Sequence, residues 1–373
     1  MKIKKISVYQ LDLPYSGGTY TLSGGRTYTS FDATIVSIET DTGLEGWGES
    51  TPFGATYIAS HAMGVRAGIA ELAPALIGRD PRQLDRINEL MDRTLVGHLH
   101  AKTAIDVACW DLFGKSVNMP VCELLGGSTG QRMPTIDSTY AGSPEDMRRR
   151  VALTREQGYL GHSIKVGASA EEGGPMLDAA RIEASLADAR PGEYYIVDCN
   201  GGLTPEHALR MLNLLPKGLD FVLEAPCSTW RENMSLRKRT SIPIIFDELA
   251  TDDSSIAKII TDDAAEGIGL KISKNGGLTR GRRQRDMCIS AGLTVSVQET
   301  TGSHIAFAAI AHLGQTIPSQ YLRCILDCRD MITPVTAHFD APLVDGGILV
   351  PNKPGLGIEV NRELLGNPIA IFE

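Results

Sequence analysis

The sequence predicts an α/β fold: a (β/α)8 TIM-type barrel preceded by a separate N-terminal α+β domain, called the cap below. From about residue 133, some eight short apolar runs alternate with helical stretches, which is typical of consecutive βα units. Before residue 127, strands precede helices without alternation, which indicates a separate α+β unit. Since 373 residues exceed one simple core, we assign the cap to residues 1–127, completed by about 341–373, and the barrel to 128–340.

The capping domain is predicted to begin with an antiparallel meander. Residues 3–12 and 32–40 have the alternation and β-branched content of strands, and a turn at residues 41–43 leads into a third strand at 44–49. Helical apolar spacing follows, although Pro74 is expected to end or kink the first helix. The predicted helices span residues 62–76, 80–95 and 101–115.

Two segments of the cap have the composition of loops. Residues 16–30 are rich in Gly, Ser, Thr and Tyr and include Arg26, and residues 50–60 include Tyr57. Such segments offer turn chemistry and few apolar anchors, so we expect both to be mobile. Loops of this kind commonly determine substrate specificity, which makes Arg26 and Tyr57 candidate substrate contacts.

The barrel is predicted from its alternating pattern. Candidate strands cover residues 134–139, 162–166, 194–199, 220–224, 243–247, 267–272, 293–298 and, least clearly, 322–326. Candidate helices cover residues 144–157, 174–190, 204–215, 254–260, 278–291 and 303–313. After residue 340 the pattern breaks into short turns, and we expect this tail to return to the first domain.

Composition excludes several classes of function. A net charge of −9 and a pI near 5.5 argue against a nucleic-acid partner. No run of 18 apolar residues could span a membrane, and the N-terminus alternates instead of forming a signal-peptide core. Seven cysteines, an odd number within core-like runs, suggest reduced thiols. We therefore predict a cytoplasmic protein that acts on a small molecule, and we expect a homo-oligomer.

Five polar residues lie at the ends of successive apolar runs: Lys165, Asp198, Glu224, Asp247 and Lys271. Their separations, between 23 and 33 residues, match one βα unit each. Strand ends of a parallel barrel meet at one rim, where three carboxylates would repel one another unless a cation lay between them. A lone Asp at such a place is more often a helix N-cap, but three in succession favour a metal site. Oxygen ligands favour Mg²⁺, one per subunit.

Several motifs, in this order, resemble the enolase superfamily in its mandelate racemase and muconate lactonizing branch. They are GWGE at 46–49, DVACWDLFGK to LLGG within 106–127, IKVG at 164–167, DCN at 198–200, EAP at 224–226, DE at 247–248, KISKNGGL at 271–278 and PGLGI at 354–358. The resemblance covers the whole chain. It implies a cap over a modified barrel whose first strand pair is irregular. It also implies magnesium on Asp198, Glu224 and Asp247, with Lys165 and Lys271 as acid/base residues on opposite faces of a bound carboxylate.

Within that family, the nearest branch resembles the cis-3-hydroxy-L-proline dehydratases and the proline-betaine epimerases. Most of the lactonizing subgroup has Lys-x-Lys where this chain has Ser163-Ile164-Lys165, and the hydroxyproline branch also lacks the first lysine. Other positions differ from that branch: Thr301 and His304 replace its Trp and Asp, and Leu22 replaces a loop Trp. A Trp face would hold a cationic ring nitrogen, so these three positions speak against a proline-like substrate.

The implied chemistry is abstraction of the α-proton of a carboxylate through an enediolate, with the metal stabilising the developing charge. The lysine base must be neutral, and we expect the metal, the other lysine and burial to lower its pKa. The leading hypothesis is a Mg²⁺-dependent dehydratase of a hydroxyproline-like amino acid. A racemase or epimerase of an amino acid or related acid is the alternative. A Schiff-base aldolase and a non-catalytic binding protein are the competing classes.

Further residues are predicted around this site. Strand alternation places Asn200 on the face of Asp198 and directs Glu248 away from Asp247, toward a lysine of a neighbouring strand. Lys274 is expected to be solvated or salt-bridged. Glu299, at the end of the seventh strand, could orient Lys271 or contact substrate. Additional candidates for substrate contact are Thr301 and His304.

Overall fold

The computed structural model describes residues 1–373. A four-stranded antiparallel sheet lies at one end, in the order β17-β1-β4-β5. Its strands are β1 (Ile3–Pro14), β4 (Ser30–Thr40), β5 (Glu45–Ser50) and β17 (Ala370–Phe372). The predicted meander is therefore present, and the last strand of the chain completes it by pairing with β1.

Three helices pack on this sheet: α1 (Ala62–Leu76), α2 (Leu84–Thr94) and α3 (Leu99–Val117). Gly46 and Gly48 lie where β5 crosses α3, and a Cβ at Gly48 would overlap the carbonyl oxygen of Ala104. The GWGE motif thus allows a helix to lie directly on the sheet. Pro74 lies in the last turn of α1 and lacks the N–H that would bond to the carbonyl of residue 70; the helix ends two residues later, at Leu76, as expected.

Eight parallel strands form a closed barrel, as predicted. They are β6 (Met133–Thr139), β7 (Gly161–Lys165), β8 (Tyr194–Asp198), β9 (Val222–Glu224), β10 (Ile244–Phe246), β11 (Gly267–Lys271), β12 (Thr294–Gln298) and β13 (Leu322–Leu326). The implied irregularity of the first strand pair is wrong, because β6 and β7 pair in unbroken register. The register shift lies between Val295 and Ser296, where β12 meets β13.

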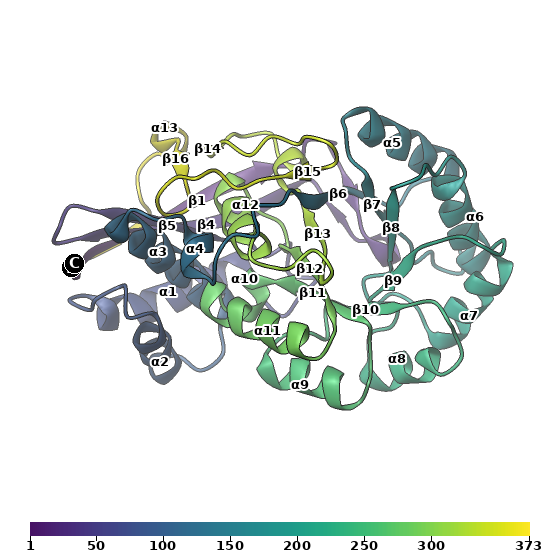
Figure 1. Ribbon diagram of the computed structural model, residues 1–373, viewed down its shortest axis with the longest axis horizontal. Helices are drawn as coiled ribbons and strands as arrows, with labels where there is room; N and C mark the ends of the chain where they lie inside the picture. Colours follow the sequence, from purple (N-terminus) through teal and green to yellow (C-terminus); the bar gives the residue numbers. More distant parts are fainter.

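Helices cover the outside of the barrel (Figure 1). They are α5 (Pro144–Glu156), α6 (Gly174–Leu186), α7 (Pro205–Leu214), α8 (Trp230–Arg237), α9 (Asp253–Thr261), α11 (Leu278–Ser290) and α12 (His304–Gly314), with a short α10 (Ile272–Asn275) directly after β11. Helix α8 is not among the predicted helices, although Thr229 and Glu232 form a capping box that signals its start. No α-helix follows β13, which leads into a 3₁₀ turn at Arg329–Met331.

Short elements connect these parts. They are β2 (Tyr20–Thr21), the 3₁₀ turn Ser23–Gly25, β3 (Thr27–Tyr28), α4 (Val121–Leu124), β14 (Ala337–Phe339), β15 (Gly347–Ile348), β16 (Ile358–Val360) and α13 (Arg362–Leu365). The C-terminal tail contacts the N-terminal unit before reaching β17, since the backbone N–H of Leu356 donates to Asp111 at 2.8 Å. We propose the division into a cap (1–127 with 341–373) and a barrel (128–340) on this arrangement.

One cluster of 80 buried apolar residues extends from the N-terminal sheet into the barrel. A continuous core of this size holds the two parts together and so fixes the loops of the cap over the barrel mouth. All seven cysteines are buried, and none forms a disulfide. None of the helices is both long and apolar enough to cross a membrane.

Candidate active site

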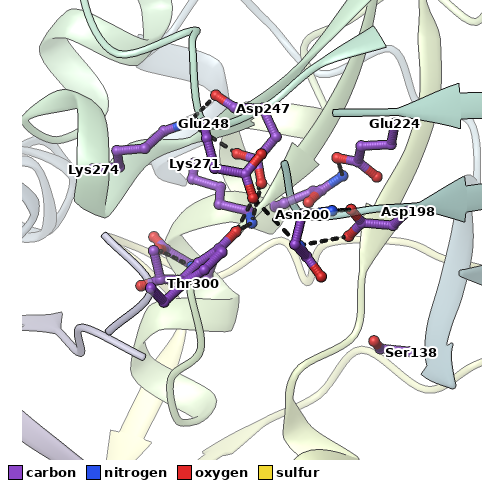
Figure 2. Close-up of polar contacts among 12 residues, drawn as sticks. Ser138, Asp198, Asn200, Glu224, Asp247, Glu248, Lys271, Lys274 and Thr300 are labelled. Atoms are coloured by element: carbon purple, nitrogen blue, oxygen red, sulfur yellow. Dashed lines mark hydrogen bonds and ion pairs between the residues drawn. The ribbon is translucent and has the colours of Figure 1, made fainter. Parts of the chain in front are cut away.

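The five predicted residues lie at the carboxyl ends of barrel strands, on one rim. Lys165 pairs in register with Asp198, and Asp198 with Glu224, so three neighbouring strands present these side chains side by side. Asp247 follows β10 and Lys271 ends β11. All five residues are between 1% and 7% exposed, so their charges interact in a largely water-free environment. Figure 2 shows four of them, Asp198, Glu224, Asp247 and Lys271.

Lys165 and Asp198 form a buried ion pair. Asn200 supports Asp198, since its backbone N–H donates to Oδ1 at 2.9 Å and its side-chain Nδ2 to Oδ2 at 3.1 Å. Burial lowers the pKa of Lys165, but the charge of Asp198 outweighs burial and holds the pKa above its ordinary value. The expected lowering of this pKa is therefore not seen in the protein alone, because carboxylates surround the amine.

Asp247 binds two lysines at once. Lys271 Nζ lies 2.6 Å from Oδ2 and Lys274 Nζ 2.8 Å from Oδ1, while Tyr57 donates its hydroxyl to Oδ2 at 2.9 Å. Although burial raises the pKa of Asp247, Lys271 and Lys274 hold it well below its usual range. The salt-bridged alternative for Lys274 is therefore the one observed, and the short helix α10 carries this lysine back toward Asp247.

Glu248 points into the same region, contrary to the prediction. It forms no ion pair with lysine; instead Asn200 Nδ2 donates to its Oε1 at 3.3 Å, and Oε2 has no partner. Strand alternation does not apply to residue 248, because β10 already ends at Phe246. Burial and then the charge of Asp247 raise the pKa of Glu248 to about 7.

Glu224 lies between the two ion-paired carboxylates, and Gln298 Nε2 donates to its Oε1 at 3.0 Å. Burial and then the charges of Asp198 and Asp247 raise its pKa to about 8. Gly269 on β11 leaves room for this group, since a Cβ there would lie 2.8 Å from Glu224 Oε1. The centre of the rim is thus rich in oxygen ligands, and the mutual repulsion of its carboxylates is part of what raises the pKa of Glu224.

A chamber of about 20 Å³ lies among these residues, closed by both predicted loops. Its lining comprises Tyr20, Leu22, Phe53, Tyr57, Ile136, Ser138, Ser163, Lys165, Asp198, Asn200, Lys271, Gln298, Glu299, Thr300, Leu326 and Met331. A separate cavity of about 640 Å³ lies beside it, lined among others by His100, Glu248 and Lys274. Tyr57 lines both spaces, so its side chain separates them.

The remaining predicted residues lie at different distances from the chamber. Arg26 connects the loops to the barrel, since it donates to the backbone oxygens of Thr56 at 3.1 Å and Asn200 at 3.4 Å. Thr301 and His304 are not in the chamber lining. Glu299 does line it, but its partners are Ser273 and Thr300 rather than Lys271.

The oxygen-rich rim fits a hard divalent cation. Two buried oxygens, Asn200 Oδ1 and Glu248 Oε2, have no hydrogen-bond partner next to Asp198 and Asp247. As they stand, the carboxylates form no closed ligand cluster; Asp198 is paired with Lys165, and Asp247 with Lys271. A divalent cation would compete with these ammonium groups for the same oxygens, and all-oxygen donors suit Mg²⁺.

Two family models match the chain. Residues 24–126 match the N-terminal domain of the mandelate racemase/muconate lactonizing enzymes, and residues 146–364 match the enolase C-terminal domain-like family. A solved mandelate racemase/muconate lactonizing enzyme relative from Roseovarius nubinhibens, in complex with magnesium, is 55% identical with a TM-score of 0.98, each chain being fully covered. Another, from Aspergillus oryzae, is 62% identical with a TM-score of 0.92, over 100% of this chain and 99% of that one.

Relatives with assigned activities are also similar over the whole chain. A cis-3-hydroxy-L-proline dehydratase from Roseibium aggregatum is 38% identical over 100% of both chains. An N-succinyl-L-Arg/Lys racemase from Bacillus cereus is 30% identical over 100% of this chain and 99% of that one. The barrel, the cap and these similarities agree: the chain is an enzyme that belongs to the mandelate racemase/muconate lactonizing enzyme family of the enolase superfamily.

Proposed function

We propose that this enzyme is a Mg²⁺-dependent dehydratase that removes the α-proton of a hydroxyproline-like amino acid, with one Mg²⁺ per subunit. The observation that carries the proposal is the placement of Lys165 and Lys271 four strands apart in an eight-stranded barrel, with Asp198, Glu224 and Asp247 on the strand ends between them. A carboxylate bound between the lysines presents one face to each. That arrangement suits proton transfer at the carbon next to the carboxylate.

The residues of the rim would have different roles in metal binding and proton transfer. Asp198, Glu224 and Asp247 would hold the cation, which supplies positive charge where the substrate carboxylate becomes an enediolate. Once Asp198 is engaged elsewhere, the charge that raises the pKa of Lys165 is withdrawn, and burial then favours the neutral amine. Lys165 would accept the α-proton, while Lys271 would occupy the opposite face.

The substrate assignment rests on the lining of the chamber and on similarity. Apolar side chains such as Leu22, Phe53 and Met331 lie beside the two lysines and could contact the ring carbons of a substrate, although the chamber of about 20 Å³ must widen to admit one. The dehydratase relative acts, by its name, on a hydroxylated proline. No Trp lines the chamber, so a cationic ring nitrogen would find its contacts among Tyr57 and the carboxylates instead.

A racemase is the second candidate. The observation favouring it is the same pair of lysines, since one could remove the α-proton and the other could return it on the opposite face. The racemase relative shows that family members of this length perform such chemistry.

Deuterium exchange tests the proposal. The protein with Mg²⁺ in D₂O is expected to exchange the α-proton of cis-3-hydroxy-L-proline and to release water from it, and EDTA is expected to stop both, as followed by NMR. Exchange with accumulation of the other α-epimer and no loss of hydroxyl would favour the racemase. Activity that survives EDTA and is lost on borohydride trapping would instead indicate a Schiff-base aldolase.

A further inference from the structure

Glu299 is a buried carboxyl that the lysine pair and the metal ligands do not use. It directly follows β12 and is 2% exposed, and it lines the chamber together with both lysines. In the β11–β12 register Lys271 pairs with Gln298, so Glu299 lies on the Lys271 side of the chamber. Lys165 lies across the barrel, on β7.

The hydrogen bonds of Glu299 fall on one oxygen. Ser273 Oγ donates to Oε2, and the backbone N–H of Thr300 donates to the same atom at 3.2 Å. Thr300 is itself held by its hydroxyl, which donates to the carbonyl of Thr51 at 2.6 Å. No Lys, Arg or His forms an ion pair with Glu299. Its Oε1 is thus the atom left to carry a proton.

Glu49 is the informative comparison, because it is equally buried and lies nearby. Both of its oxygens accept hydrogen bonds: Oε1 from Thr51 at 2.7 Å and from the backbone of Ser303 at 2.9 Å, and Oε2 from Ala306 at 3.2 Å. Glu49 is therefore fully occupied in joining the cap to the barrel. Burial raises the pKa of both carboxyls, but Glu299 accepts hydrogen bonds at one oxygen only, and its pKa of about 8 leaves Oε1 able to hold a proton at neutral pH.

We propose that Glu299 is the general acid that protonates a hydroxyl leaving from the β-carbon, which makes the substrate class β-hydroxy α-amino acids. This inference rests on the proposed function, since it requires α-proton removal by Lys165. A dehydratase must supply a proton to its leaving group, because hydroxide leaves poorly on its own. The chamber offers that proton from a neutral carboxylic acid, on the side opposite to Lys165.

The step balances without an external reagent. The neutral amine of Lys165 takes the α-proton, and the electron pair of the broken C–H bond forms the double bond between the α- and β-carbons. The β-carbon–oxygen bond breaks, and the leaving oxygen takes the proton of Glu299, which gives water, a carboxylate at Glu299 and an ammonium at Lys165. Transfer of one proton from Lys165 to Glu299 through solvent restores both groups.

Base and acid on opposite sides of the chamber favour anti elimination. In cis-3-hydroxy-L-proline the hydroxyl and the carboxylate share one face of the ring, so the α-hydrogen lies on the other face. Its α-hydrogen and hydroxyl are therefore placed for Lys165 and Glu299, respectively. The trans isomer would present both groups to one side and is expected to eliminate more slowly.

Glu299→Gln tests the role, since it preserves shape and the acceptor for Ser273 but cannot deliver a proton. The Mg²⁺-loaded variant in D₂O is expected to exchange the α-proton of cis-3-hydroxy-L-proline as the parent does, while water release falls at least ~100-fold. The 3-chloro analogue, whose chloride leaves without a proton, should be eliminated at the parental rate. Glu299→Asp should restore part of the dehydration.

Asp137→Asn serves as the matched control, because Asp137 is another buried carboxyl, 6% exposed, on β6 and is not part of the chamber lining; the substitution should leave both activities unchanged. Parental dehydration by Glu299→Gln would overturn the role of Glu299. An equal loss of exchange and dehydration would also overturn it, since Glu299 would then be needed for α-proton removal or for the arrangement of the chamber, and not specifically for departure of the hydroxyl. Absence of exchange in the parent enzyme would instead overturn the proposed function itself.

Discussion

The two sides of the barrel mouth are built differently. On the β7–β8 side, one lysine meets one carboxylate, Lys165 and Asp198, and Ser163 stands beside them. On the β10–β11 side, Asp247 holds Lys271 and Lys274 together and also accepts the hydroxyl of Tyr57. The first side is a single ion pair, which one competing cation can break. The second side is a network in which Asp247 stays paired with Lys274 when its ion pair with Lys271 is broken.

This difference assigns different tasks to the two lysines. Lys165 becomes free to change its protonation state as soon as Asp198 is engaged, which suits a base. Lys271 shares its carboxylate with Lys274 and donates to Tyr57 at 2.8 Å, which suits a charge held in a fixed position. Substitutions on each side therefore test whether the asymmetry determines chemistry or only stability.

The largest expected effect is loss of the metal. Asp198→Asn and Asp247→Asn, one on each side, should both reduce bound Mg²⁺ from one per subunit toward zero and abolish α-proton exchange, because a neutral amide is a weak ligand for a hard cation. Metal analysis and exchange measured on the same samples provide the test. An unchanged Mg²⁺ content in either variant would remove that residue from the ligand set.

Next in size is the loss of one lysine. Lys165→Ala and Lys271→Ala should each slow turnover by ~10²–10⁴-fold, the usual contribution of a positioned acid or base. The asymmetry predicts that Lys271→Ala still exchanges the α-proton of the enantiomer that faces Lys165, whereas the double variant exchanges neither. Equal exchange of both enantiomers by Lys165→Ala would show that the two lysines do not divide the faces.

The sequence was sufficient for the parts of this site that depend on strand periodicity. Lys165, Asp198 and Glu224 end strands whose register places them side by side, and a parallel barrel allows no other arrangement. Glu248 was misplaced because the strand before it had already ended. The partner of Lys274 could not be foreseen either, since it depends on the one-turn helix α10 that follows β11. Contacts made beyond strand ends depend on local backbone turns that periodicity does not encode.

A smaller effect is expected for the second lysine of the network. Lys274→Met should lower the free energy of unfolding by roughly 1.5–3 kcal/mol, because a buried charge-assisted hydrogen bond to Asp247 is lost while Lys271 still neutralises that carboxylate. Chemical denaturation measures this change. Lys258→Met is the control, since its pair with Asp262 is exposed and should contribute at most ~1 kcal/mol. If both variants lost the same unfolding free energy, the buried network around Asp247 would contribute no more stability than an exposed ion pair.

The smallest expected effect concerns His100, which lines the 640 Å³ cavity on the Lys274 side. Its Nδ1 lies 3.1 Å from Ser50 Oγ, whereas its buried Nε2 has no partner. Burial, and then the charge of Lys274, lowers its pKa to about 3. The unfolded chain binds a proton here at a pKa of about 6.5, so the stability contributed by neutral His100 is complete above pH 6.5.

The stability contributed by neutral His100 is lost as the pH falls from 6.5 toward 3, because the unfolded state binds a proton at this residue and the folded state does not. The drop in unfolding free energy between pH 7 and pH 5 should therefore be smaller in His100→Gln than in the parent by roughly 2 kcal/mol. Denaturation series at the two pH values measure the difference, and His338→Gln, at an exposed position of β14, is the control. If the unfolding free energies of the parent and His100→Gln changed equally with pH, the folded protein would not hold His100 neutral. The charge of Lys274 would then act on Asp247 and not on His100.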